Sequence, residues 1–322
     1  MVAVLLVIVA IFRTVESSDA SRQSSDEVTI LLIQSSPDAA IQTLTVTNTS
    51  VTVNNSPNVP TPKSIDRPRM LTVNQRIYAI AAFDSDDEKG VEMLTNNRWT
   101  QQSPTNHKRS GAVVGFLPIA GLIFACGCFH QNDPCAKSCE FRPEATDSTW
   151  IVRQMRPTEC VVYAQGVEYQ GIIYVSGGKD CDGYRIARLV SYSYTKGEWR
   201  TLAPMNEARY EHAMTVDGNS FVVCGGWDSS LIASCERYTP IDNTWRTMTP
   251  LNYRLLYLSL FTVIPNQLIM FGGYGSVNGS YRHYQHVDVY LKGQWNTLTV
   301  VNIENVAGAP FGATVLPKRR AE

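Results

Sequence analysis

The chain has 322 residues, of which 44% are hydrophobic, enough for a sizeable core in one large domain or two small ones. Lysine and arginine number 28 against 29 aspartates and glutamates, so the formal net charge is −1. This balance argues against nucleic acid or an anionic membrane as the main partner.

The N-terminus is apolar without interruption from Val2 to Phe12 and then meets Arg13 and a polar run. This stretch is too short to span a bilayer, but its length fits the core of a signal peptide. No lysine or arginine precedes it, so a frayed N-terminus is the alternative. We interpret residues 1–20 as either a signal peptide or a frayed N-terminus, and we expect no integral membrane span.

Residues 21–66 contain neither a glycine pair nor a tryptophan. Val28 to Ile33 and Leu44 to Val53 are rich in residues that favour strands, whereas Ser56 to Pro68 has the composition of a linker. We expect an irregular or short-stranded segment here. A degenerate extra unit of the repeat described next is the alternative, although no marker residue supports it.

From residue 67 onward, one pattern recurs five times. An apolar run is stopped by a glycine pair, a second short strand follows, and a lone tryptophan comes last. Successive tryptophans are 51, 49, 46 and 50 residues apart. The marker residues are Gly127, Gly177, Gly178, Gly225, Gly226, Gly272 and Gly273, with Trp99, Trp150, Trp199, Trp245 and Trp295. A period near 50 is typical of kelch-type β-propellers.

The pattern predicts an all-β propeller with five recognisable blades over residues 67–318. Blades lie face to face, so their inner strands are apolar on both sides, and each tryptophan is expected on an outer strand against the next blade. The first unit has Ala81 and Ala82 where glycines belong, and no room for an opening strand before Ile77. We therefore expect Phe311 to Leu316 to enter the first blade and close the ring.

Several phrases resemble the propellers of the BTB-BACK-kelch family. They are Ile-Tyr-Val-Ser-Gly-Gly ending at Gly178, Cys-Glu-Arg-Tyr ending at Tyr238, Leu-Ala-Pro-Met ending at Met205, and Arg-Tyr-Glu-His from Arg209. In that family the propeller is a substrate receptor, and separate BTB and BACK domains bind a cullin-RING ubiquitin ligase. About 66 residues precede the repeats, too few for both domains. The resemblance therefore implies protein binding without recruitment of a ligase by this chain.

The eight cysteines allow more than one interpretation. Cys126, Cys128, Cys135 and Cys139 are close in sequence, but zinc ligands are usually paired with two residues between them. We expect buried or free thiols in a reducing cytosol. In an exported protein one or two disulfides are expected instead, and Cys224 with Cys235 could bridge adjacent strands.

Enzyme chemistry has little support in the sequence. Some kelch propellers resemble copper radical oxidases, but the histidines here are scattered, and the only close pair, His283 and His286, would point to opposite faces of a strand. No nucleophile elbow, phosphate loop or paired-carboxylate motif is present. We expect no catalytic residue, no metal and no cofactor, with a copper oxidase-like enzyme as a remote alternative.

Loops after each glycine pair and the residues that open each unit should meet at one rim of the propeller. The resemblance implies that arginines at the openings grip acidic peptides, although Glu159 breaks the pattern in the third unit. An alternative is that some of these arginines only pair with carboxylates inside the propeller. The predicted partner-binding residues are Phe83, Arg109, Phe129, Lys179, Arg209, Tyr210, Trp227, Arg254 and Tyr274.

We therefore expect a protein-interaction module that binds an acidic protein or peptide through its loop face. The family resemblance implies a cytoplasmic location. A secreted, disulfide-bearing adhesion or matrix-binding propeller is the alternative if Val2 to Phe12 acts as a signal peptide.

Overall fold

The computed structural model describes strands, turns and one short helix, η1 (Pro134–Lys137). The described ranges are 69–74, 76–81, 88–96, 98–144, 148–155, 160–264, 266–277, 280–284, 286–298 and 300–301, with the backbone of 4–11, 28–35, 41–46 and 51–55. The prediction of an all-β fold is confirmed.

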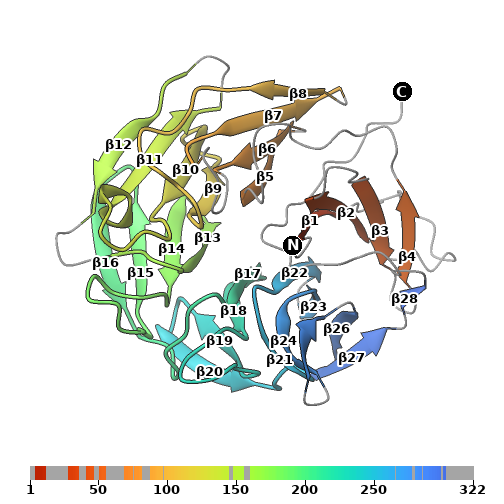
Figure 1. The fold of residues 1–322 in the computed structure, drawn as a ribbon. Helices are drawn as coiled ribbons and strands as arrows, with labels where there is room; N and C mark the ends of the chain where they lie inside the picture. Colours follow the sequence, from red (N-terminus) through yellow and green to blue (C-terminus); the bar gives the residue numbers. More distant parts are fainter. Residues whose placement is uncertain are drawn as a thin grey trace, which may run out of the picture.

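Five four-stranded antiparallel sheets follow one another as the blades of a propeller (Figure 1). Within each blade the strands are neighbours in sequence order. Blade 1 contains β5 (Arg69–Val73), β6 (Arg76–Ile80), β7 (Val91–Thr95) and β8 (Arg98–Gln101). Blade 2 contains β9 (Val113–Leu117), β10 (Leu122–Cys126), β11 (Ser138–Pro143) and β12 (Ile151–Gln154). Blade 3 contains β13 (Gln165–Tyr169), β14 (Ile172–Ser176), β15 (Leu189–Ser193) and β16 (Glu198–Leu202).

Blade 4 contains β17 (Ala213–Asp217), β18 (Ser220–Cys224), β19 (Cys235–Thr239) and β20 (Thr244–Met248). Blade 5 contains β22 (Ser259–Ile264), β23 (Gln267–Phe271), β26 (Val287–Leu291) and β27 (Gln294–Leu298). The segment around β23 also forms a small sheet from β21 (Arg254–Leu256), β24 (Tyr274–Val277) and β25 (Ser280–His283). The second strands β10, β18 and β23 are buried along their whole length, as continuous apolar runs between blades require.

The N-terminal segment forms a separate sheet rather than loops. Its strands are β1 (Val4–Ile11), β2 (Val28–Ser35), β3 (Ile41–Val46) and β4 (Val51–Asn55), and β28 (Val300–Val301) pairs with β4 in parallel. In Figure 1 this sheet stands between blade 5 and blade 1. Short strands in this segment were predicted, whereas a strand at Val4–Ile11 was not.

Blade 1 supplies its own innermost strand. β5 runs antiparallel to β6, with Arg69 opposite Ile80 and Val73 opposite Arg76. Asn74 takes a left-handed φ of 45°, which asparagine tolerates and which a tight hairpin needs. The sequence predicted no room for an opening strand before Ile77. That prediction is wrong, because a tight turn joins β5 directly to β6 and leaves room for the strand. The closing strand predicted at Phe311 to Leu316 lies outside the described residues.

The glycine pairs let neighbouring blades approach closely. The N–H of Gly178 donates to the carbonyl of Arg209 at 2.8 Å, and that of Gly226 donates to the carbonyl of Leu255 at 2.7 Å. Gly226 has φ +99°, and a Cβ there would lie 2.7 Å from the Tyr210 carbonyl oxygen. In blade 1 the same turn is made by Ala81, which is left-handed at φ 53°.

The tryptophans of blades 2 to 5 join each of these blades to the preceding one. Their indole N–H groups donate to carbonyl oxygens of the segment that leaves the preceding blade, in the pairs Trp150 to Ser103 at 2.9 Å, Trp245 to Ala203 at 2.8 Å and Trp295 to Thr249 at 3.1 Å. Trp199 shares a core cluster with Phe124 and Phe141 of blade 2. The predicted packing against the next blade is therefore wrong in direction. Trp150 also lies one residue before its outer strand rather than on it.

All eight cysteines are paired, so the expectation of free thiols is wrong. Cys126–Cys139 and Cys224–Cys235 join residues directly opposite each other on the second and third strands of blades 2 and 4, with Cα–Cα distances of 4.0 and 4.2 Å. Antiparallel neighbours bring opposite residues within disulfide range. Cys128–Cys135 and Cys160–Cys181 instead tie loops at one end of the propeller.

Candidate functional site

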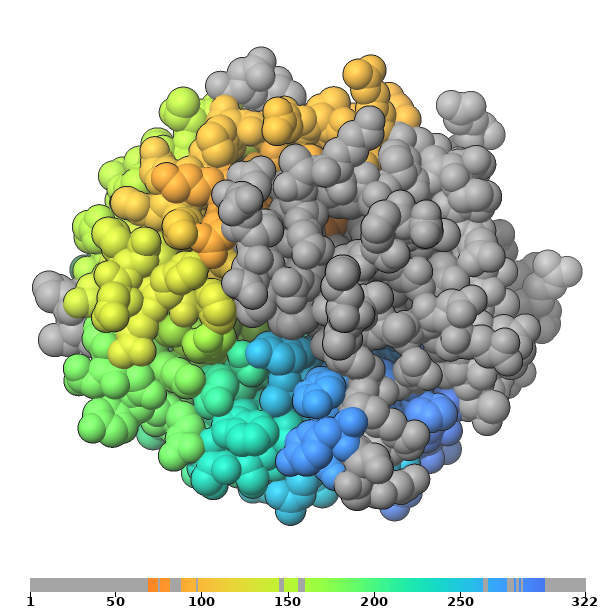
Figure 2. Space-filling model, viewed as in Figure 1, coloured from red at the N-terminus to blue at the C-terminus, as the bar shows by residue number. Residues whose placement is uncertain are grey.

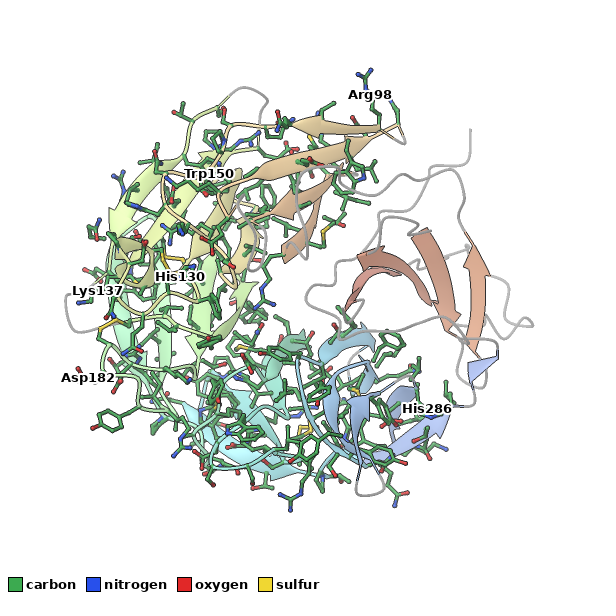
Figure 3. The ribbon with its side chains drawn as sticks, in the orientation of Figure 1. Arg98, His130, Lys137, Trp150, Asp182 and His286 are labelled. Atoms are coloured by element: carbon green, nitrogen blue, oxygen red, sulfur yellow. A yellow bond between two sulfur atoms is a disulfide. The ribbon has the colours of Figure 1, made fainter. Side chains whose placement is uncertain are left out.

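The loops after the second strands and the segments that open each blade meet at one end of the propeller, called here the loop face. Val162 forms a backbone bridge with Lys179, and Tyr210 forms one with Trp227. The Gln131 side chain donates to the Cys181 carbonyl and so joins the loops of blades 2 and 3, which carry His130 and Asp182 on the same side of the ring in Figure 3. In Figure 2 the residues of blades 2, 3 and 4 adjoin one another around the rim.

Arg109 and Arg209 do not face a partner, because both side chains are completely buried. Arg209 donates to Glu236 at 2.8 Å and to the carbonyls of Gly225 and Ser234. Arg109 repeats this arrangement with Glu140 at 3.0 Å and the carbonyls of Gly127, Cys135 and Ser138. Each arginine therefore braces the loop of its own blade, and the prediction that it binds a partner is wrong.

Arg254 is exposed and donates to the Leu231 carbonyl at 3.1 Å. It is not the positional equivalent of Arg209. The Gly178 N–H donates to the Arg209 carbonyl and the Gly226 N–H to the Leu255 carbonyl, so Leu255 occupies the arginine position in blade 5. The sequence analysis aligned Arg254 with Arg209, but the equivalent residue is Leu255, one position later.

Where a blade lacks the buried arginine, it also lacks the glutamate that pairs with it. In blade 5, where Leu255 replaces the arginine, Asp288 occupies the place of Glu236 and accepts a hydrogen bond from the Tyr284 hydroxyl at 2.9 Å. Burial raises the pKa of Asp288. In blade 3 the two places are taken by Val161 and Val190. Glu159, which was expected to break the arginine pattern, lies outside the described residues.

The other predicted partner-binding residues lie on the loop face as half-buried side chains. They are Phe129, Lys179, Tyr210, Trp227 and Tyr274. The Phe129 ring packs edge-on against Tyr163 at 5.0 Å, and Tyr274 packs near Tyr281 at 6.1 Å. Phe83 lies outside the described residues.

Blades 3 and 4, with the segment that opens blade 5, form a charged and aromatic mouth at this face, consisting of Tyr163, Lys179, Tyr210, Glu211 and Tyr257. The Lys179 ammonium lies 4.2 Å from the centroid of the Tyr210 ring and 4.9 Å from that of Tyr163. Both distances are within the range of cation–π attraction. The Glu211 carboxylate accepts a hydrogen bond from the Tyr257 hydroxyl at 2.5 Å.

A backbone ladder positions these side chains. Tyr163, Glu211 and Tyr257 have left-handed φ values of 56°, 55° and 56°. The Glu211 N–H donates to the Tyr163 carbonyl, and the Tyr257 N–H donates to the Glu211 carbonyl, each at 3.0 Å. Each of these three non-glycine residues adopts a conformation that costs roughly 1 kcal/mol, so the backbone of the mouth is strained.

The mouth also perturbs its ionisable groups. Burial raises the pKa of Glu211 to about 7, although the Tyr257 hydroxyl and the charges of Lys179 and Arg69 oppose this rise. Burial also raises the pKa of Tyr257 and that of Tyr210, and the Glu211 charge adds to both shifts. Desolvation lowers the pKa of Arg69 to about 10, with Glu211 acting in the opposite sense.

A pocket of about 330 Å³ opens beside the mouth between blades 3 and 4. It is lined by Lys179, Gly183, Tyr184, Arg185, Tyr210 and Asp228. Arg185 is already neutralised, because its Nε lies 2.9 Å from the Asp228 carboxylate. The Cys160–Cys181 disulfide ties down the loop that carries most of this lining.

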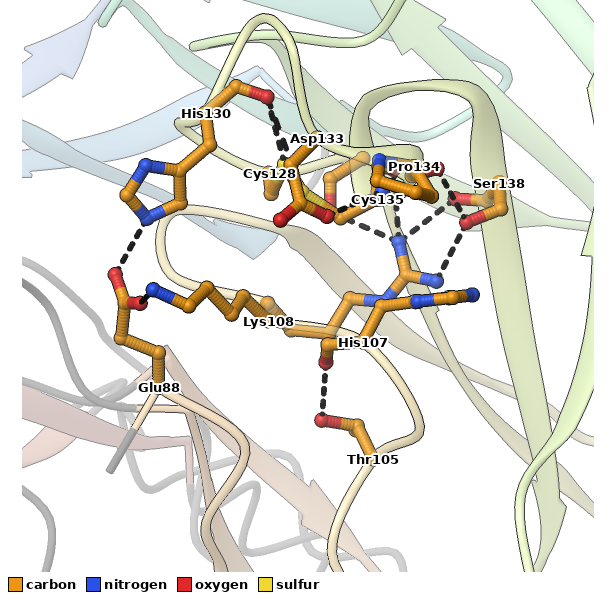
Figure 4. Close-up of a disulfide and its surroundings, with 12 residues drawn as sticks. Glu88, Thr105, His107, Lys108, Cys128, His130, Asp133, Pro134, Cys135 and Ser138 are labelled. Carbon is orange, nitrogen blue, oxygen red and sulfur yellow. Dashed lines mark hydrogen bonds and ion pairs between the residues drawn. A yellow bond between two sulfur atoms is a disulfide. The ribbon is translucent and has the colours of Figure 1, made fainter. Parts of the chain in front are cut away.

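A second charged cluster joins blades 1 and 2 (Figure 4). The Glu88 carboxylate contacts His130 Nε2 at 2.5 Å and Lys108 Nζ at 2.6 Å. Burial alone would raise the pKa of Glu88, but these two partners lower it overall. Because the Cys128–Cys135 disulfide holds the loop carrying His130, this corner is a structural tie between blades.

Sequence reasoning missed Tyr163, Glu211 and Tyr257, and also Tyr184 and Arg185. Tyr163 and Glu211 each precede the second glycine of their blade by 15 residues, so an alignment on the glycine pairs would have singled out these positions. Tyr184 and Arg185 lie in a loop without repeat markers, and only the fold places them beside Lys179.

Within the part of the chain that the structure describes, no group of three His, Cys, Asp or Glu side chains is arranged to hold a metal ion. Ser176 Oγ lies 2.8 Å from His212 Nε2, but both side chains are buried, so this contact belongs to the packing of blades 3 and 4. No helix among the described residues is both long and apolar enough to cross a membrane.

Comparison with known proteins agrees with this geometry. A family model described as the kelch motif matches residues 208–252, which include blade 4. Kelch-like protein 40 of Mus musculus is 33% identical over 123 residues, 38% of this chain and 20% of that protein. Kelch-like protein 36 of Bos taurus is 26% identical over 62% of this chain and 33% of that protein. Beta-scruin of Limulus polyphemus is 37% identical over 26% of this chain and 10% of that protein.

The chain thus spans a third or less of the length of these three relatives. Among solved structures, one described as "Structure of YjhT" superposes with a TM-score of 0.64 over 75% of this chain and 87% of that one. Its sequence identity is 14%, so this likeness concerns the fold alone.

Proposed function

We propose that this chain, a kelch-repeat β-propeller homologous to the kelch-like proteins at low identity and over part of its length, binds a partner protein through the loop face between blades 3 and 4. It acts as a binding module rather than as an enzyme, and its partner presents an acidic segment. The observation that carries the proposal is the mouth itself, where aromatic rings and a lysine surround an open pocket.

The residue types support partner binding. Tyrosine, tryptophan and arginine contribute most of the binding energy at protein interfaces. Tyr184 is 72% exposed at the pocket edge, and Tyr210 and Trp227 lie beside it. A rigid scaffold with a loop anchored by the Cys160–Cys181 disulfide loses little conformational entropy on binding.

A photoreactive amino acid at position 184 tests this proposal, with the same group at position 241 as the matched control. Ile241 is 92% exposed but lies in the turn between β19 and β20, at the opposite end of blade 4. We expect one protein to be crosslinked from position 184 and not from position 241, and its purified form to bind the wild-type chain. Equal crosslinking from both positions would contradict the proposal.

We also propose that the chain works in an oxidising compartment, as an exported propeller. The support is the pairing of all eight cysteines, because disulfides persist in oxidising compartments and are rare in the cytosol. N-terminal sequencing of the endogenous protein, together with thiol labelling before and after reduction, tests this. Eight reactive thiols without reduction would contradict it.

A further inference from the structure

The lysine at the mouth is held in place but keeps hydrogen-bonding capacity. Two tyrosine rings restrain the Lys179 ammonium, at 4.2 and 4.9 Å from their centroids. A ring face attracts the charge but leaves N–H donors of the ammonium for other acceptors. Among the described residues, no carboxylate forms an ion pair with Lys179.

The pocket beside this lysine has room for one acidic side chain. Its volume is about 330 Å³, and its two other charged lining residues, Arg185 and Asp228, neutralise each other at 2.9 Å. Lys179 is therefore the charged lining residue whose charge no other lining residue neutralises. The hydroxyl-bearing ring of Tyr184 is exposed at the same pocket and can pack against the stem of an entering side chain.

Glu211 follows Tyr210, the ring that Lys179 contacts, and interacts electrostatically with the Lys179 ammonium. Its side chain is nearly buried and is hydrogen-bonded to Tyr257 at 2.5 Å. The groups that face it are the cations Lys179 and Arg69 and the phenols Tyr257 and Tyr210. When Glu211 is ionised it attracts the Lys179 ammonium, and when it is protonated that attraction disappears.

We propose that the Lys179 ammonium binds an aspartate or glutamate side chain of the partner in this pocket, and that Glu211 competes with that side chain for the ammonium, so that binding strengthens when Glu211 is protonated. This inference rests on the proposed function and deepens it, because it names the group that is recognised and the proton that controls recognition.

The direction of the pH effect follows from linkage. Burial places the pKa of Glu211 near 7, so its charge changes between pH 8 and pH 6. A bound carboxylate repels the ionised form of Glu211, and binding therefore takes up a proton. Uptake of one proton strengthens binding by at most about tenfold per pH unit. We expect the affinity to be about five- to tenfold higher at pH 6 than at pH 8, since the coupling between the two carboxylates is partial.

The test uses the peptide acetyl-Gly-Gly-Glu-Gly-Gly-amide and its glutamine counterpart, titrated into the isotope-labelled full chain by NMR. The glutamate of the peptide stays ionised across this pH range, because its ordinary pKa is about 4.3. We expect the acidic peptide to shift the signals of Lys179 and Tyr210, with tighter binding at pH 6, and the glutamine peptide to leave them unchanged.

Two variants assign the roles. Lys179→Gln should abolish binding at both pH values, and Glu211→Gln should bind equally well at both. Thermal unfolding of each variant shows that its fold is intact. Equal shifts from the two peptides, or the same pH dependence in Glu211→Gln as in the wild type, would overturn the inference. If position 184 crosslinks a partner while the acidic peptide shifts nothing, the proposed function stands and this inference fails; if both experiments are negative, both fail.

Discussion

Arg209 and Glu236 form a buried ion pair, with the guanidinium Nη2 2.8 Å from the carboxylate Oε1. The arginine is fully buried and the glutamate almost so. Blade 2 repeats the pair as Arg109 and Glu140. A motif that sequence similarity would assign to ligand binding therefore braces the loop of its own blade in this chain.

Truncation of Arg209 should destabilise the fold. In Arg209→Ala, Glu236 becomes a buried charge without its cation, and removal of one partner of a buried pair costs about 3–5 kcal/mol. Urea unfolding measures this cost. Arg254→Ala is the matched control, since Arg254 is exposed and its loss should change stability by less than about 0.5 kcal/mol. An unchanged unfolding midpoint in Arg209→Ala would show that the pair contributes nothing.

The pH dependence of stability should report on Glu211. Its folded-state pKa of about 7 lies above the ordinary value of 4.5, so its stabilising contribution is complete below pH 4.5 and is lost as the pH rises through 7. At about 1.4 kcal/mol per pKa unit, the loss approaches roughly 3 kcal/mol. Glu211→Gln should therefore be more stable than the wild type at pH 8 by up to about that amount, and equal to it near pH 4. Chemical unfolding at both pH values measures the difference, and a constant offset across the range would refute the assignment.

Gly226 should tolerate no larger residue. A Cβ at this position would lie 2.7 Å from the Tyr210 carbonyl, and φ is +99°. Gly226→Ala combines a backbone clash with an unfavourable conformation, so we expect a loss of about 2 kcal/mol or more. Ala81 provides the converse experiment, because it adopts φ 53° in blade 1. Ala81→Gly should be neutral or stabilising by up to about 1 kcal/mol. Differential scanning calorimetry compares the two, and equal destabilisation would argue against conformational strain as the cause.

The Cys160–Cys181 disulfide should stabilise both the fold and the pocket loop. It closes a segment of 21 residues, for which chain entropy predicts about 3 kcal/mol. The double variant Cys160→Ser, Cys181→Ser should lose roughly this stability, and its loop around Tyr184 should exchange amide hydrogens faster. Replacing both Cys224 and Cys235 is the control, since that pair joins β18 to β19 within blade 4 and should leave exchange at the loop around Tyr184 unchanged. Unaltered exchange around Tyr184 in the first variant would show that backbone contacts alone hold the loop.

The sequence alone predicted the all-β propeller and its five repeat units, although not the strand β5 that opens blade 1. Those features depend on local rules: apolar runs between facing blades, glycines at left-handed turns such as Gly178, and one tryptophan at or beside each outer strand. Each repeat states the same rules again, so five copies leave little ambiguity.

Only the tertiary structure decided which polar residues face solvent. Arg209 and Arg254 look alike in sequence, but one lies inside the loop of its own blade and the other lies outside, because Leu255 takes the buried place in blade 5. The tie of Trp245 to the preceding blade and the meeting of Lys179 with Glu211 likewise depend on contacts between residues tens of positions apart. Such contacts are set by how the blades pack, and no local pattern encodes them.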